Sequence, residues 1–133
     1  MSTHIESVDY AKLQAAGGPV SFTKQIGYGP LYYLTATVLV FGDSYDQVQV
    51  TFTNLAGLFP NAPIFLNTQD TTQTNLVFNN GLMTLTINQV QLFAPTPDTA
   101  GSVSLNAKWT DINGSGSQSF VGTIARWTNP PKA

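Results

Sequence analysis

The sequence has no cysteine, a single histidine (His4) and a single glutamate (Glu6). The absence of cysteine excludes disulfide bonds, thiolate metal ligands and thiol nucleophiles. His4 lies in the expected N-terminal arm, whereas a Ser-His-Asp relay needs a rigidly held imidazole and a histidine metal centre needs further ligands. The aspartates fall mostly in predicted turns, where their carboxylates bond to nearby backbone. With no glycine-rich nucleotide loop either, we expect a protein that is not an enzyme and has no cofactor, unless calcium binds as considered below.

Charge is also scarce, because only 9% of the residues are charged against an average of about 25%. The five Lys and Arg residues are scattered along the chain, whereas binding to nucleic acid needs clustered basic side chains. No apolar run approaches the roughly 20 residues of a transmembrane helix. The first ten residues lack the apolar region of a signal peptide. We therefore expect no nucleic-acid partner and no transmembrane segment, in a protein that is cytoplasmic or exported without a cleaved signal.

The composition that remains is typical of a folded β-protein. Hydrophobic residues make up 42% of the chain, and Thr, Ser, Asn and Gln supply about a third of it. Threonine tolerates the half-exposed positions of a pleated sheet well. A length of 133 residues suits one domain. We place that domain at residues 19–128, after a short helix or arm at 1–18 and before a tail at 129–133.

Alternating and β-branched segments predict the strands. Residues 31–41 form an apolar, β-branched run between turn residues, 47–53 alternate apolar with polar, and 64–66 begin another short strand. Asn80-Gly81 predicts a two-residue hairpin that places Phe78 opposite Met83. The apolar phase then slips at Asn88-Gln89, which predicts a β-bulge.

A second hairpin is expected near the C-terminus, with a turn at Asn113-Gly114. This register pairs Ala107 with Phe120, Leu105 with Gly122 and Val103 with Ile124. We count about seven to eight strands with turns mostly every 8–15 residues. That spacing predicts an all-β antiparallel sandwich of Greek-key or jelly-roll-like connectivity.

Two loops are candidate ligand sites. The first contains Asp43, Tyr45 and Asp46, and the second contains Asp111 and Asn113. The four Asp and Asn side chains are also the candidate metal ligands, because calcium prefers oxygen donors and glycine permits a sharp loop. The alternative interpretation of both loops is a simple hairpin turn.

The aromatic residues favour a function in binding. Trp127, like Tyr45, is placed either on the surface or in the core, and an exposed ring beside amides is typical of a sugar site. We therefore expect a non-catalytic carbohydrate-binding, lectin-like module with a glycan partner. The alternative is a structural or self-assembling subunit, as a particle component or a pore-forming oligomer, since the surface has low charge and few edge lysines. Either function is compatible with a homo-oligomer.

Overall fold

The computed structural model describes residues 20–28, 32–42, 44–54, 57–58, 63–79, 83–96, 98–111 and 116–127. The predicted helix or arm at 1–18 and the tail at 129–133 lie outside these residues. The described part of the chain contains no helix long and apolar enough to span a membrane.

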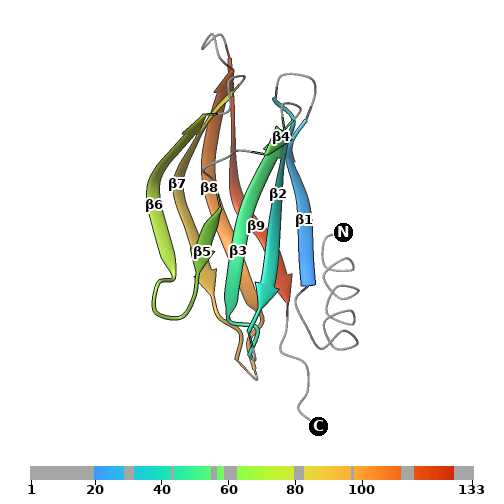
Figure 1. Cartoon of the computed structure of the whole chain (residues 1–133), viewed down its shortest axis with the longest axis vertical. Helices are drawn as coiled ribbons and strands as arrows, with labels where there is room; N and C mark the ends of the chain where they lie inside the picture. Colours follow the sequence, from blue (N-terminus) through green and yellow to red (C-terminus); the bar gives the residue numbers. More distant parts are fainter. Residues whose placement is uncertain are drawn as a thin grey trace.

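The described residues form nine strands in two antiparallel sheets, which confirms the all-β sandwich class (Figure 1). The first sheet contains β1 (Val20–Gly27), β2 (Leu34–Phe41), β3 (Gln47–Asn54), β4 (Gly57–Leu58) and β5 (Ile64–Leu66). The second sheet contains β6 (Thr72–Asn79), β7 (Met83–Phe93), β8 (Gly101–Asp111) and β9 (Ser117–Trp127). The strand beyond the expected seven or eight is the two-residue β4, which is too short to show an alternation.

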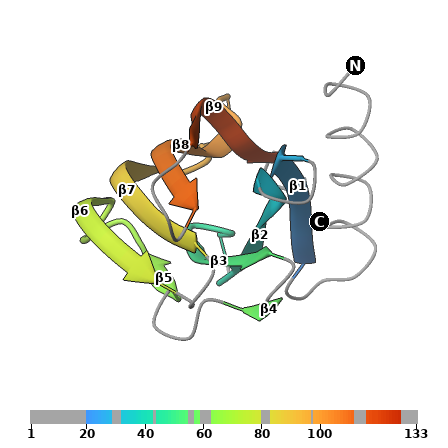
Figure 2. The same ribbon diagram turned by 90° about the horizontal axis from the view of Figure 1, so that it is seen from above.

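Most strands that follow one another in the chain pair with each other, except that β4 and β5 both pair with β3 and that β5 and β6 lie in different sheets. The order is β1-β2-β3-β4 in the first sheet, with β5 also pairing β3, and β6-β7-β8-β9 in the second. This up-and-down order corrects the expected Greek-key or jelly-roll-like connectivity. Such folds need a long connection that returns past other strands, whereas here β1 to β4 and β6 to β9 each pair in chain order. Seen from above, β9 lies beside β1 and β5 lies beside β6 (Figure 2).

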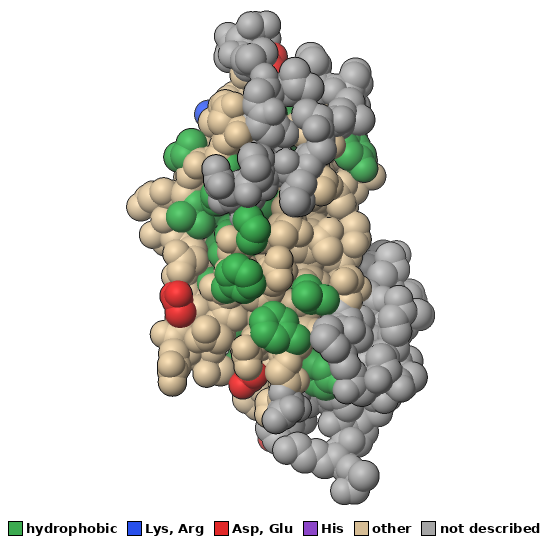
Figure 3. Space-filling model, viewed as in Figure 1, with side chains coloured by type: hydrophobic (Ala, Val, Ile, Leu, Met, Phe, Trp, Pro, Cys, Tyr) green, Lys and Arg blue, Asp and Glu red, His purple; other side chains and the backbone are tan. Residues whose placement is uncertain are grey.

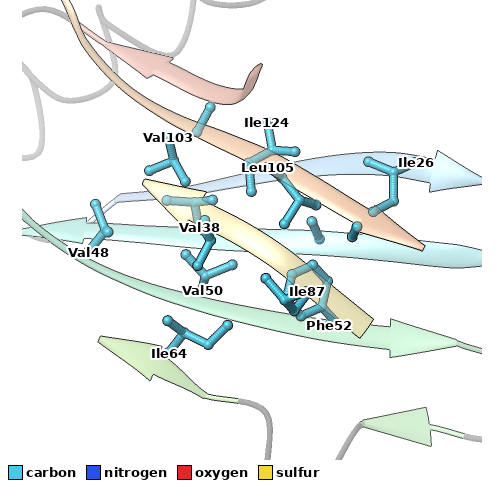
Figure 4. Close-up of a cluster of buried hydrophobic side chains, with 14 of the residues drawn as sticks. Ile26, Val38, Val48, Val50, Phe52, Ile64, Ile87, Val103, Leu105 and Ile124 are labelled. Atoms are coloured by element: carbon cyan, nitrogen blue, oxygen red, sulfur yellow. The ribbon is translucent and has the colours of Figure 1, made fainter. Parts of the chain in front are cut away.

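The core fills the space between the sheets with alternate side chains from both. Inward-facing residues of the central strands, such as Val38 and Val50 in the first sheet and Ile87 and Leu105 in the second, are almost fully buried (Figure 4). Burying a side chain of this kind stabilises the fold by roughly 1.5–3 kcal/mol. The outward positions between them are threonine, glutamine and serine for the most part, so the alternation in the sequence defines both faces of each sheet.

The Asn80-Gly81 hairpin has a different register from the predicted one. Phe78 pairs with Leu85, not Met83, and Asn79 pairs with Thr84, so residues 80–83 lie between the last paired positions. The difference is a shift of two residues. Because side chains alternate with a period of two, this shift keeps every apolar residue on the predicted face. The hydrophobic pattern therefore predicted the faces correctly but could not distinguish these two registers.

Two β-bulges change which residues of the second sheet face inward. The predicted bulge near Asn88 is confirmed by the register shift between Ile87 and Gln89. In the β8–β9 pair, Ala107 lies opposite Phe120 and Leu105 opposite Gly122, as predicted. Val103, however, lies opposite Ala125 and not Ile124, because β9 carries a further bulge at this point. This second bulge decides where the last residues of β9 point.

Candidate functional site

The two aromatic residues expected to contact a ligand lie in the core. Tyr45 is 7% exposed and Trp127 is 1% exposed. The Trp127 Nε1–H donates to the Tyr45 backbone oxygen at 2.9 Å, and the Trp127 ring lies 6.0 Å from that of Phe22. The β9 bulge brings Ala125 and Trp127 to the inner face and leaves Arg126 outside. Of the two placements left open by the sequence, the structure has the core placement for both Tyr45 and Trp127.

The two candidate loops lie at opposite ends of the sandwich. Trp127, at the end of β9, contacts the β2–β3 turn through Tyr45, whereas β9 begins at Ser117 beside the other loop. The 11 residues of β9 span about 33 Å. Asp46 and Asp111 therefore cannot share a ligand. The Asp111 backbone N–H donates to the Gly116 oxygen at 3.3 Å, which closes the β8–β9 hairpin.

Metal ligands are not gathered in the described part of the chain. It contains no group of three or more His, Cys, Asp or Glu side chains placed to hold an ion. Calcium takes six to eight oxygen ligands. Of the four candidate ligands, Asp43 and Asn113 lie outside the described residues, so a calcium site stays a prediction that involves Asp46 or Asp111 separately.

A polar depression of about 260 Å³ lies beside the β2–β3 turn. Its lining residues are one carboxylate, one hydroxyl and three amides: Asp46, Gln47, Asn67, Thr68 and Gln69. Asp46, one of the side chains predicted to bind a ligand, lies in this surface depression. The described residues of the lining include no Lys or Arg.

One rim of the depression is a tight turn held by several hydrogen bonds. The backbone groups of Asn67 and Asp70 bond to each other in both directions, at 3.1 and 3.2 Å. The Asn67 Oδ1 accepts the backbone N–H groups of Gln69 at 2.8 Å and of Asp70 at 3.0 Å. The Asp70 Oδ2 accepts the Gln73 Nε2–H at 2.9 Å. These bonds fix the turn and the Asn67 side chain, so the Asn67 amide is held in place before a ligand arrives.

An exposed aromatic ring adjoins the depression on the outer face of the first sheet. Phe65 is 58% exposed, because it is the outward residue of β5 between the buried Ile64 and Leu66. It pairs with Gln49. Gln47, which comes two residues before Gln49 on the same face of β3, lines the depression. Side chains directly opposite in a sheet have Cβ atoms about 5 Å apart, and diagonal ones about 7–8 Å. Phe65 and Gln47, which lines the depression, are therefore diagonal neighbours on this face.

The same face of the molecule is visible in Figure 3. Hydrophobic side chains are exposed there among uncharged polar ones, and acidic side chains are visible in the lower half and at the top. Phe65 is not among the site residues predicted from the sequence. Its signal was the alternation in Ile64-Phe65-Leu66, in which the middle residue of a short strand must face away from its neighbours.

Comparisons with protein-family models, with curated proteins and with solved structures found no match to this chain. The geometry of the site is therefore the basis for its proposed function.

Proposed function

We propose that the protein is a non-catalytic carbohydrate-binding module whose ligand lies against the Phe65 ring and over the adjoining depression. The observation that carries this proposal is the exposed ring beside a lining of amide, hydroxyl and carboxylate groups. A sugar has an apolar face of C–H groups and a rim of hydroxyls. An aromatic ring covers the first, and fixed polar groups bind the second.

Each polar side chain of the depression has a defined capacity. The Asp46 carboxylate accepts hydrogen bonds from hydroxyls, and the Gln47 and Gln69 amides both donate and accept them. The Asn67 oxygen already accepts two backbone N–H groups, which leaves its Nδ2–H groups as donors to a ligand. Among the described lining residues no cation accompanies the Asp46 carboxylate, which disfavours anionic ligands. We therefore expect neutral sugars or amino sugars to bind better than sulfated sugars or uronic acids.

The test is a glycan-array screen of the purified protein, followed by titration of the best ligand against two variants. Phe65→Ala removes the ring, and we expect it to weaken binding by about 1–3 kcal/mol, or roughly 5- to 150-fold. The matched control is Phe93→Ala, since Phe93 is 47% exposed and lies in the second sheet, on β7. Equal losses in both variants, or an array without specific binding, would overturn the proposal. Running the array with calcium and again with chelator tests the calcium prediction at the same time.

A structural or self-assembling subunit is the second candidate, and the outer face of the second sheet favours it. That face presents mainly uncharged polar side chains, with Lys108 and Arg126 as the charged exceptions and Val77, Phe93 and Val121 as the apolar ones. Examples of the uncharged polar residues are Thr84, Thr86, Gln89, Gln91, Asn106 and Thr123. A surface with little charge has little electrostatic repulsion to oppose self-association. A blank glycan array together with self-association in solution would support this second candidate.

A further inference from the structure

Strand β6 forms an open edge of the second sheet. Among the described strands it pairs with β7 alone. The short strand β5 lies beside its first half, to which a tight turn at residues 67–70 connects it (Figures 1 and 2). The second half of β6 extends beyond β5 (Figure 1). An unpaired strand edge presents backbone N–H and C=O groups that another strand can bind.

The charged residues and prolines that usually protect an edge strand are missing from β6. Its sequence, TQTNLVFN, contains no lysine, no proline and no acidic residue. Asn75 has a φ of 58°, and this left-handed residue interrupts the first half of the strand. The segment after it carries three consecutive apolar residues. Val77 is 64% exposed on the outer face, and Leu76 and Phe78 are half-buried on the inner face. Hydrophobic side chains are visible along this edge in Figure 3.

This segment is complementary to a copy of itself in one register. In a symmetric dimer with a two-fold axis perpendicular to the sheet, the inner faces of both copies lie on the same side of the joined sheet. This requires an antiparallel pairing in which one residue lies directly opposite its own copy, and the pairing is then centred on that residue. Centred on Val77, the pairing sets Val77 against its own copy on the outer face and Leu76 against the copy's Phe78 on the inner face. Centred on Leu76 or Phe78, it sets the exposed valine against an asparagine. Apolar cross-strand pairs stabilise a sheet, and the segment has no charge to oppose its copy.

We propose that two copies of this chain associate through antiparallel pairing of their β6 strands, centred on Val77. The pairing joins the two four-stranded sheets into one continuous sheet and gives each exposed apolar residue of the segment an apolar partner. It involves only about five residues of each strand, so the interface is smaller than that of a permanent dimer. The dimer is therefore concentration-dependent. This inference does not depend on carbohydrate binding.

The absence of cysteine allows a clean cross-linking test. Directly opposite residues of antiparallel strands have Cα atoms about 4.5–5.5 Å apart, within the range that a disulfide bridges. Under mild oxidation of dilute protein, we expect Val77→Cys to form a disulfide-linked dimer of twice the 14.3 kDa chain mass. The control is Val121→Cys, because Val121 is 73% exposed on the outer face of β9, at the other edge of the sheet. A monomeric Val77→Cys variant, or equal cross-linking of both variants, would overturn the proposal.

Sedimentation velocity tests the same contact without a covalent bond. We expect the wild-type chain to dimerise as its concentration rises, and Val77→Lys to raise the dissociation constant on the order of tenfold or more, because two lysines would lie directly opposite each other. Val121→Lys adds the same charge away from the contact and should leave the equilibrium unchanged. A dimer that persists in Val77→Lys, or a wild-type chain that stays monomeric at high concentration, contradicts the β6 contact.

Discussion

Tyr45 and Phe65 lie at the same end of the first sheet, yet the Tyr45 side chain is 7% exposed and that of Phe65 is 58% exposed. Tyr45 is in the turn between β2 and β3, where a φ of 50° and a hydrogen bond from its N–H to the Gly42 oxygen bend the chain. Phe65 is in a regular strand whose alternation points it outward. Turn geometry and strand phase, not the polarity of neighbouring residues, decide which ring is available to a ligand.

The largest effect is expected from the buried partner of Tyr45. Trp127→Ala removes a fully buried indole, and we expect it to lower the free energy of unfolding by about 3–5 kcal/mol, as measured by urea denaturation. Because domains of this kind have total stabilities of about 5–15 kcal/mol, the variant can fail to fold.

Trp127→Phe then gives a second measurement of the same contact. It keeps most of the ring but leaves the Tyr45 backbone oxygen without the indole N–H, and the expected loss is about 1–3 kcal/mol. An unchanged stability in both variants would contradict a structural role for Trp127.

Tyr45→Ala is expected to have the next largest effect. Loss of its buried ring should lower the free energy of unfolding by about 2–4 kcal/mol. Thermal and urea unfolding measure this loss, and a titration of the variant at a temperature where it is folded measures glycan binding. A variant with wild-type stability and lost binding would restore Tyr45 as a direct ligand contact and would remove the contrast with Phe65.

Much of the fold follows from patterns in the sequence, because alternation reports the faces of long strands. The bulge near Asn88 could be predicted since the apolar phase changes there between Ile87 and Val90. The β9 bulge gave no such signal. Ile124 and Ala125 are both apolar and both buried, so the phase change that turns Trp127 inward is hidden in two similar residues.

The candidate site was predictable only in part. Asp46 was predicted because a carboxylate in a loop is a common ligand group, and it does line the depression. Asn67 and Gln69 come from a different loop, and only the pairing of β3 with β5 brings them beside Asp46. A three-residue strand such as β5 contains too little alternation to define its partner or its register from sequence.

The smallest change in stability is expected for Phe65→Ala, and this variant tests the contrast between Phe65 and Tyr45 most directly. Phe65→Ala truncates a ring that is mostly in solvent, so the free energy of unfolding should change by less than about 0.5 kcal/mol while glycan binding falls. Tyr45→Ala should show the reverse pattern, with stability lost and the binding surface intact. Measured side by side, the two variants separate a ring that binds from a ring that packs. If Phe65→Ala instead loses as much stability as Tyr45→Ala, Phe65 has a structural role, and its exposure no longer supports a binding site.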